Sequence, residues 1–537
     1  MKQTSVTLRG GVAAMLSVAM RLVAMLSVAL MLLAAEHLGA QQVHNAKYPK
    51  DPAFAPLQKS DMGETITFTM ESSKIYAGTS REITVYVPKE YTGKEPACLL
   101  VCLDGVLFNA ITVMQNLISS GEMPVTIGLF VQPGVIYARS GEAGSSSKAG
   151  SGSKVGSGSK AGSGSKAGSG VKADSGAGES SSGAQKRVQR YNRSNEFDRV
   201  DGTFARFLEE EVLPLVATLK CSGGQPLLIS SNPNNRAITG ASSGAICAFS
   251  AAWFRPDLFR RVYSSVGTFV AMRGGNQYPW IIRKTEPKPL RIYLQDGVND
   301  AWNPLFGEWW EANQLMESAL DFAGYELFFK WDRGGHSIKH GTALFPDAMR
   351  WLWRGWPAAV ECGCSRNDML QALLPEQQAA QRSQPWQRCS LTAEERALFE
   401  EACKSSLEAI SPGGWSKAVA QKGSMWIYSY TANNPGSPDT EWENGLEFYY
   451  LHSAPNQIAF DTEGNLYVAS EIGIQVCDHN GRVRAILNGP KGSVERMLFI
   501  GNRLIVESGG ELFCRELRAA GSRNPFEEQL PKSQGQG

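Results

Sequence analysis

Apolar residues between positions 48 and 356 fall into two alternating patterns: short runs typical of strands, and longer segments with helical spacing. The strand-like runs cover residues 64–70, 81–87, 97–103, 125–131, 237–240, 290–294 and 326–331. Some of them, such as residues 98–103, are apolar throughout. A continuous apolar strand predicts a sheet that is covered on both faces.

Segments with helical spacing lie between several of these runs. Residues 201–219 carry five large apolar side chains near helical spacing, namely Phe204, Phe207, Leu208, Val212 and Val216. Residues 245–253 are typical of an apolar helix, and residues 345–356 form a second apolar helix that can close the domain. The alternation predicts an α/β fold over residues 45–357.

The pattern changes after Trp356. Residues 358–411 are polar and favour helices, and residues 391–395 resemble a capped helix start. Residues 412–518 show short strand-like runs separated by Gly, Asn and Asp turns, with the spacing of propeller blades or of a meander. These runs are residues 425–430, 457–460, 466–469, 474–477, 483–487, 498–500, 504–507 and 512–515. We therefore expect a smaller all-β module, followed by a disordered tail over residues 519–537.

The N-terminal segment has the pattern of an export signal. Lys2 and Arg9 precede an apolar stretch over residues 11–35, and residues 38–40 offer a small-residue cleavage site. This predicts a signal peptide over residues 1–40, and a secreted or periplasmic protein without stable membrane insertion once the leader is cleaved. An uncleaved membrane anchor is the alternative, because a stretch of this length can span a bilayer.

Residues 139–187 form a six-residue Gly/Ser/Lys repeat inside the α/β domain. It places lysines six positions apart, at Lys148, Lys154, Lys160, Lys166 and Lys172. Such a composition cannot bury a core, so it predicts a flexible loop whose ends can lie close together. We interpret it as a tolerated insertion; a tether to an acidic cell surface is the alternative.

The composition argues against some classes of binding partner and identifies none. Lys plus Arg (53) nearly cancels Asp plus Glu (52), so no overall charge favours nucleic acid or an anionic membrane. Three cysteines in apolar runs are expected to be buried thiols: Cys98, Cys102 and Cys247. Four lie in a polar stretch, where one or two disulfides are the expectation and a zinc site the weaker alternative: Cys362, Cys364, Cys389 and Cys403.

A candidate nucleophile lies at Ser242, within the sequence Gly-Ala-Ser-Ser-Gly of residues 240–244. This G-x-S-x-G pattern follows a strand-like run and precedes a helical one, the setting of a nucleophile elbow. A sharp turn of this kind exposes the serine, and the helix N-terminus favours negative charge beside it. A small-residue turn without chemistry is the alternative, and the flanking elements favour the nucleophile.

A serine hydroxyl needs a base, and the chain has only six histidines. His336 follows two glycines just after the strand-like run 326–331, whereas His340 could be a surface residue or a helix cap. The acid should follow the run 290–294, where Asp296 and Asp300 are both candidates. We choose Asp300 because the loop beyond the strand can turn back towards His336.

An oxyanion hole should combine the amide N–H of Ser243 with one from the loop after an early strand. Residues 103–106 end the apolar run 97–103, which makes the amide of Gly105 or Val106 the second candidate.

These motifs together resemble an esterase family that includes enterochelin esterases, feruloyl esterases and the mycolyltransferases of the antigen 85 type. The resemblance rests on residues 103–105, 240–244, 297–300 and 334–337, and covers roughly residues 49–356 apart from the insert. It implies an α/β-hydrolase sheet with Ser242, Asp300 and His336 as the catalytic triad. The family has a short connection where this chain carries the insert.

The all-β module resembles part of a gluconolactonase or regucalcin-like propeller, in residues 458–469 and 473–476. It has too few strands for a six-bladed ring, and Asn456 and Gln457 stand where that family usually has an Asp-Gly pair whose Asp binds the metal. Lactonase activity is therefore not expected, and a truncated or repurposed module is the better interpretation.

Taken together, the sequence predicts a secreted serine ester hydrolase that works through an acyl-enzyme and needs no cofactor or metal. The family suggests an ester of a carbohydrate or of a siderophore-like compound. Three tryptophans beyond the acid, Trp302, Trp309 and Trp310, could form a sugar platform or could simply pack in the core. An acyltransferase using the same triad and a non-catalytic carbohydrate-binding protein are the alternatives.

Overall fold

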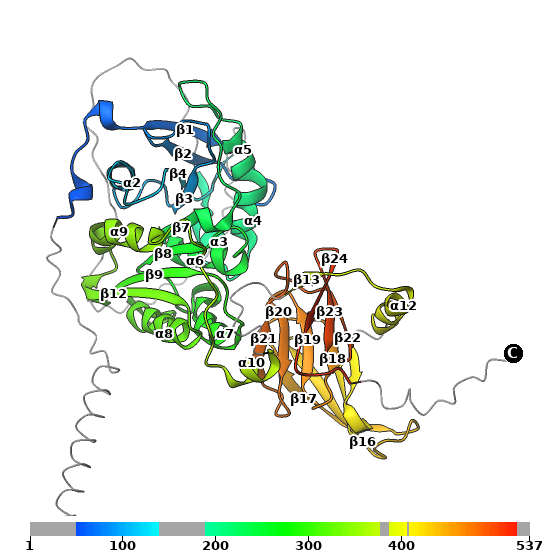
Figure 1. The fold of residues 1–537 in the computed structure, drawn as a ribbon. Helices are drawn as coiled ribbons and strands as arrows, with labels where there is room; N and C mark the ends of the chain where they lie inside the picture. The colour runs from blue at the N-terminus through cyan, green and yellow to red at the C-terminus, as the bar shows by residue number, and fades with distance from the viewer. Residues whose placement is uncertain (1–49, 139–187, 376–385, 405–406, 523–537) are drawn as a thin grey trace, which may run out of the picture.

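The computed structural model describes residues 50–138, 188–375, 386–404 and 407–522. An α/β domain comes first along the chain, and a smaller all-β module follows it (Figure 1). The predicted signal peptide and the Gly/Ser/Lys repeat lie outside the described residues, as does most of the predicted disordered tail.

The α/β domain is built on one mixed sheet of eight strands in the order β1-β2-β4-β3-β7-β8-β9-β12. Its strands are β1 (Glu64–Met70), β2 (Arg81–Val87), β3 (Cys98–Leu103), β4 (Thr126–Val131), β7 (Arg236–Ala241), β8 (Arg261–Ser265), β9 (Arg291–Asn299) and β12 (Glu326–Gly335). From β4 to β12 every neighbouring pair is parallel, while β1 and β2 are added in antiparallel fashion. The loops that follow β3, β7, β9 and β12 therefore gather at one edge of the sheet.

Helices cover both faces of this sheet (Figure 1). They are α2 (Ala110–Ser119), α3 (Arg193–Phe197), α4 (Thr203–Phe207), α5 (Leu213–Ala217), α6 (Ser243–Phe254), α7 (Tyr278–Lys284), α8 (Trp309–Phe322) and α9 (Ile338–Trp353). Along β3, Leu99 and Val101 pack into one core with α6, whereas Leu100 and Cys102 pack into a second core with α2 and α9. This alternation confirms the predicted α/β sheet buried on both faces.

The helix predicted over residues 201–219 is present from Thr203 to Ala217. Its middle turn, Leu208–Val212, is wound as a π-helix between α4 and α5. Helix α9 begins at Ile338, earlier than the predicted start at residue 345.

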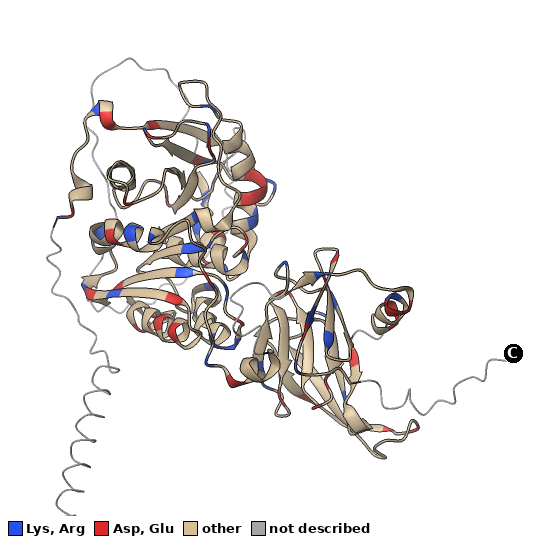
Figure 2. Ribbon diagram, in the orientation of Figure 1, with Lys and Arg blue, Asp and Glu red and all other residues tan. Residues whose placement is uncertain are grey.

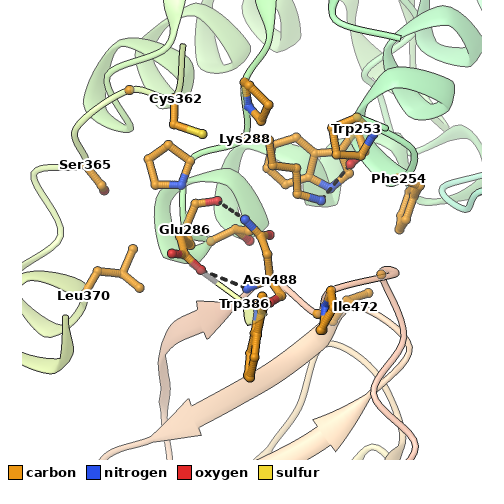
Figure 3. A pocket seen from close by; sticks show the side chains of 18 of the residues that line it. Trp253, Phe254, Glu286, Lys288, Cys362, Ser365, Leu370, Trp386, Ile472 and Asn488 are labelled. Atoms are coloured by element: carbon orange, nitrogen blue, oxygen red, sulfur yellow. Dashed lines mark hydrogen bonds between the residues drawn. The ribbon is translucent and has the colours of Figure 1, made fainter. Parts of the chain in front are cut away.

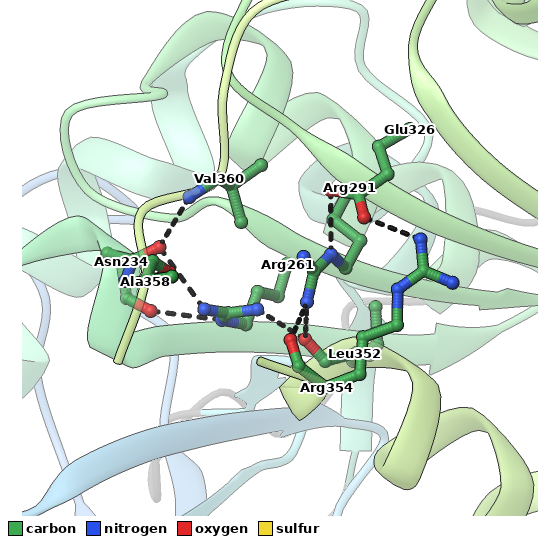
Figure 4. Close-up of polar contacts among 8 residues, drawn as sticks. All are labelled: Asn234, Arg261, Arg291, Glu326, Leu352, Arg354, Ala358 and Val360. Atoms are coloured by element: carbon green, nitrogen blue, oxygen red, sulfur yellow. Dashed lines mark hydrogen bonds and ion pairs between the residues drawn. The ribbon is translucent and has the colours of Figure 1, made fainter. Parts of the chain in front are cut away.

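Two buried arginines tie the end of α9 to the sheet (Figure 4). Arg291 donates to the carbonyl oxygens of Leu352 and Arg354 at 2.9 and 2.7 Å, and Arg261 donates to Leu352 and to Asn234. The last carbonyls of a helix carry partial negative charge, so they suit guanidinium donors. Burial, together with the neighbouring Arg291, lowers the pKa of Arg261 to about 10.

The two segments that flank the insert pair with each other. Strand β5 (Val135–Tyr137) and strand β6 (Val188–Tyr191) are antiparallel, with Tyr137 opposite Val188. The two described segments that flank the insert therefore lie side by side.

The C-terminal module consists of three four-stranded sheets whose neighbouring strands are antiparallel. Its strands are β13 (Gln387–Arg388), β14 (Glu408–Ile410), β15 (Ser416–Ala420), β16 (Trp426–Ala432), β17 (Trp442–Tyr450), β18 (Pro455–Phe460), β19 (Leu466–Ser470), β20 (Gly473–Cys477), β21 (Val483–Leu487), β22 (Arg496–Ile500), β23 (Arg503–Ser508) and β24 (Glu511–Glu516). The predicted all-β module is confirmed, but a propeller is not shown. The described part of the linker contains helices α10 (Asp368–Leu373) and α12 (Ala393–Ala402), and Thr392 caps α12 in a capping box with Glu395.

The loop between α7 and β9 contacts the all-β module. Thr285 forms a β-bridge with Ile486, and Glu286 accepts two hydrogen bonds from Arg515 at 3.0 and 3.1 Å. A cavity of about 120 Å³ lies at this junction, with Lys288 and two tryptophans among its lining residues (Figure 3). The Lys288 ammonium donates to the carbonyl oxygen of Trp253 at 2.6 Å and lies 4.3 Å from the centre of the Trp253 ring.

All ten cysteines are free thiols in the structure. Burial of Cys98, Cys102 and Cys247 is confirmed. The expected disulfides among the four cysteines of the polar stretch do not form, and Cys389 instead contacts Cys514 of β24.

Basic and acidic residues are interspersed over both parts of the structure (Figure 2). Within the described ranges, no helix is long and apolar enough to cross a membrane.

Candidate active site

The turn between β7 and α6 holds Ser242 in a backbone conformation that is rare for a non-glycine residue. Its φ and ψ are 58° and −120°, and Ser243 is the first residue of α6. A Cβ on Gly240 would lie 2.4 Å from the backbone of Gly244, so the close approach of strand and helix excludes any side chain at position 240. Strain of this kind costs about 1–3 kcal/mol and persists where the surrounding structure enforces it. The sharp strand-to-helix turn predicted for this segment is present.

The structure brings the three predicted side chains together at the edge of the sheet where β7, β9 and β12 end. His336 Nε2 lies 2.8 Å from Ser242 Oγ, and His336 Nδ1 lies 2.6 Å from Asp300 Oδ1. The Asp300 side chain is fully shielded from solvent, whereas that of His336 is about one third exposed. These contacts suit one hydrogen pattern, in which His336 donates through Nδ1 to Asp300 and accepts the Ser242 hydroxyl proton at Nε2.

Two further side chains support the Ser242 hydroxyl: Thr268, which the sequence did not single out, and Trp309, for which it suggested only a sugar platform or core packing. Thr268 Oγ1 lies 3.2 Å from Ser242 Oγ, and Trp309 Nε1 donates to Thr268 Oγ1 at 3.1 Å. Because the indole N–H is only a donor, the Thr268 hydroxyl is left to donate to Ser242. The Trp309 ring also packs edge-on against His336, with centroids 5.6 Å apart. No local motif marks Thr268, which reaches the site only because the loop after β8 turns back over the elbow.

The carboxyl groups of Asp296 and Asp300 face each other beneath His336. Their side chains lie within hydrogen-bonding range of one another, and Asp296 is completely buried. Burial, with the Asp300 carboxylate beside it, raises the pKa of Asp296 well above its usual value. Burial acts on Asp300 in the same direction, but hydrogen bonds from His336 and Asp296 outweigh it and lower the pKa of Asp300. The two candidates for the acid are therefore both in the site, and Asp300 is the one that contacts the imidazole.

The loop after β3 approaches the elbow and carries the predicted oxyanion donors. Asp104 accepts a two-pronged hydrogen bond from Arg193, at 2.6 and 2.7 Å, and Arg193 also reaches the carbonyl oxygen of Ala241 at 3.4 Å. The Gly105 amide donates to the carbonyl oxygen of Val131 at 3.3 Å. Of the two candidates in this loop, Val106 is thus the better placed to donate to a bound group.

A second histidine-carboxylate pair lies next to the first. His340 Nδ1 is 3.0 Å from Oδ1 of Asp332, whose side chain is fully shielded from solvent. His340 is therefore a partner of a buried strand residue, and it does not cap a helix. His340 lies on the first turn of α9, four residues after His336, and the sequence alone did not indicate its pairing with Asp332.

The three tryptophans beyond the acid have different environments. Trp309 is buried, and Trp310 packs edge-on against Trp331. Trp302 is 69% exposed on the short hairpin of β10 (Trp302–Asn303) and β11 (Gly307–Glu308). Of the three, Trp302 alone is available as a platform for a ligand.

Metal-ligating side chains do not cluster in the described part of the chain, where no group of three or more His, Cys, Asp or Glu residues could hold an ion.

Comparisons with known proteins give distant structural matches. No family model matches the chain, and no curated protein matches it. An enterobactin esterase from Shigella flexneri, solved in the presence of 2,3-di-hydroxy-N-benzoyl-glycine, matches with 17% identity and a TM-score of 0.37, over 57% of this chain and 63% of that one. The chain thus spans less than two thirds of that enzyme.

Two ferulic acid esterases also match. One has 15% identity and a TM-score of 0.36, over 55% of this chain and 99% of that one. The other, a CE1 ferulic acid esterase from the anaerobic fungus Anaeromyces mucronatus, has 14% identity and a TM-score of 0.35, over 58% of this chain and 98% of that one. At these identities and TM-scores, the matches assign no activity to the chain.

Proposed function

We propose that this protein is a serine carboxylic ester hydrolase with Ser242 as nucleophile, His336 as base and Asp300 as the triad acid. The observation that carries the proposal is the continuous hydrogen-bond chain from Ser242 Oγ through His336 to Asp300, at 2.8 and 2.6 Å, on a strained strand-to-helix turn. An alcohol becomes nucleophilic when a neutral imidazole accepts its proton and a buried carboxylate stabilises the imidazolium that forms.

The reaction proceeds through an acyl-enzyme. Ser242 Oγ attacks the ester carbonyl carbon while its proton moves to His336 Nε2, and the amides of Ser243 and Val106 hold the oxyanion. His336 then returns the proton to the departing alcohol, which leaves the acyl group on Ser242. Water attacks this second ester with His336 again as base, releasing the acid and restoring the serine.

The proposed substrate is a small-molecule or carbohydrate ester, with a carbohydrate or siderophore-like compound suggested by the motif resemblance. Support from the structure is the exposed pair of Trp302 and Leu305, 69% and 80% exposed, on the hairpin that follows Asp300. An exposed indole two residues after the proposed acid suits the apolar face of a sugar or an aromatic ring.

Export to a secreted or periplasmic location also belongs to the proposal and rests on the predicted signal peptide. The all-β module is proposed to be a partial, repurposed propeller-like unit without lactonase activity. No nucleic acid partner is proposed.

Labelling with a fluorophosphonate probe tests the catalytic proposal. Wild-type protein purified without residues 1–40 should form a covalent adduct, and Ser242→Ala should lose all labelling, since the reacting oxygen is gone. Ser318→Ala is the matched control, because Ser318 contacts Arg283 on the exposed surface of α8 and should leave labelling unchanged. An inert wild-type protein would refute the proposal and favour a binding role.

An ester panel from acetyl to feruloyl, on aryl and sugar alcohols, then defines the substrate. Release of free acid identifies a hydrolase. Transfer of the acyl group to an added sugar in place of water would instead identify an acyltransferase.

A further inference from the structure

The two carboxyl groups beneath His336 leave a pair of buried oxygens without a donor. The Gly297 amide donates to Asp296 Oδ1 at 2.7 Å, and the Ala301 amide donates to Asp300 Oδ1 at 2.6 Å. The Oδ2 atoms of both aspartates are buried, and no N–H or O–H of the described residues reaches either one. A buried acceptor without a donor is costly, and two of them side by side call for a common explanation.

A single proton between the two carboxyl groups satisfies both oxygens. Two carboxylates in contact within a site closed to water cannot both be ionised, so one of them keeps its proton. Asp300 already accepts from His336 Nδ1, which favours the ionised form of Asp300. The proton therefore belongs to Asp296, which has no cationic partner in its hydrogen bonds.

The surrounding groups reinforce this assignment. Asp332 on β12 is the other carboxyl group close enough to act on Asp296, and it also disfavours a charge there. Asp332 itself is held by His340 on α9 and by the Gln295 side chain, at 3.0 and 3.4 Å. The titratable groups that face Asp296 are thus Asp300 and Asp332, with His336 and His340 behind them.

We infer that Asp296 is a neutral positioning residue of the catalytic site, whose carboxylic O–H donates to Asp300 Oδ2 while His336 donates to Asp300 Oδ1. The inference rests on the proposed function and extends the triad by one member. Asp296 touches neither substrate nor nucleophile. It fixes the rotation of the Asp300 carboxylate and draws part of its negative charge away from the imidazole.

Desolvation and the adjacent Asp300, which hold the pKa of Asp296 well above the usual value, agree with the geometry. The lowered pKa of Asp300, produced against burial by hydrogen bonds from His336 and Asp296, agrees as well.

Titration of His336 tests the inference without requiring catalysis. In protein carrying histidine labelled with ¹³C at Cε1, the His336 signal is assigned by its loss in His336→Gln, and its midpoint is measured in wild type, Asp296→Asn and Asp296→Leu. Asparagine is neutral and still offers an N–H to Asp300, so Asp296→Asn should leave the midpoint unmoved. Leucine offers no donor, so Asp296→Leu should raise the midpoint by about one pH unit and slow fluorophosphonate labelling ~10-fold.

Two results would overturn the inference. If Asp296 is ionised in the wild type, Asp296→Asn removes a charge close to the imidazolium and the His336 midpoint falls by about one pH unit. If Asp296 only packs, Asp296→Leu leaves the midpoint where it is, whatever its effect on thermal stability. Failure of the proposed function is seen separately, because a wild-type protein that takes up no fluorophosphonate still gives the three His336 titrations.

Discussion

Removal of the Lys288 ammonium should stabilise the folded protein at neutral pH. Lys288 lines the cavity between the α/β domain and the all-β module, and burial lowers its pKa to about 7. The nearby Glu286 is engaged by Arg515 and by the Asn488 amide, so Lys288 has a carbonyl oxygen and two aromatic rings as its contacts. The perturbation that we consider is Lys288→Met, which keeps the length of the side chain and removes its charge.

The magnitude follows from proton linkage. An unfolded lysine has a pKa of about 10.4, so between pH 7 and about 10.4 the unfolded chain binds more protons at this position than the folded protein does. The free energy of unfolding therefore rises with pH in this window, by at most about 1.4 kcal/mol per pH unit and about 5 kcal/mol in total. Lys288 is only partly buried, which reduces the penalty, and Lys288→Met also loses the contacts with Trp253. We therefore expect the free energy of unfolding of Lys288→Met to exceed that of wild type by about 2 kcal/mol at pH 7.

Urea unfolding followed by tryptophan fluorescence at pH 7, 8 and 9 measures the difference in the free energy of unfolding and its dependence on pH. Lys288→Met should be more stable than wild type at pH 7, and the difference should shrink as pH rises. Lys491→Met is the matched control, since Lys491 lines the same cavity but is paired with Glu511. If the free energy of unfolding changes with pH equally in wild type and in Lys288→Met, Lys288 carries no buried charge and the reasoning is refuted.

Two further predictions concern the α/β domain. Replacement of residues 139–187 by a short Asn-Gly turn should preserve labelling of the active site, because Tyr137 and Val188 already pair across the base of the insert. It should raise the free energy of unfolding by about 2 kcal/mol, from the smaller entropy of closing a shorter loop, and a lower melting temperature would contradict this. Arg81→Met should lower the free energy of unfolding by about 3–5 kcal/mol, measured in urea, because it leaves the Glu196 carboxylate buried without the guanidinium that lies 2.6 Å away. If Arg81→Met unfolds like wild type, Glu196 is not ionised.

The sequence predicted most of the sheet because its strands are either apolar throughout or alternate between apolar and polar residues. Strands β1 and β2 lie where the strand-like runs 64–70 and 81–87 predict them. Strand β8 was missed because it begins with Arg261 and ends with two serines. Arg261 is fully buried there, since its guanidinium donates to the carbonyl oxygens of Leu352, near the end of α9, and of Asn234. An apolar pattern cannot reveal a strand whose charged side chain has a partner distant in the sequence.

In the all-β module, too, the apolar pattern reveals some strands and misses others. Strands β19, β20 and β21 are largely buried and follow the predicted runs closely. The short β14 and the largely exposed β17 were missed, because an exposed strand shows no contrast between its two faces. Strand β13 was also missed: it pairs with β24, more than one hundred residues away along the chain.

At the candidate site, the sequence predicted side chains that a local motif marks, and it could not predict protonation. Ser242 and His336 stand out because a turn pattern and a short list of histidines select them. Asp300 was preferred to Asp296 because of its reach and because of the family resemblance at residues 297–300, and Asp296 was given no role in the site. The parallel register of β9 and β12 places Asp296 opposite Trp331 and Gly297 opposite Asp332. Asp296 and Asp332 are therefore buried where the two strands end, whereas Asp300 lies beyond β9 and contacts His336. Because the charge of a carboxyl group depends on what surrounds it, the same residue type at two positions four apart can supply the charge at one and the proton at the other.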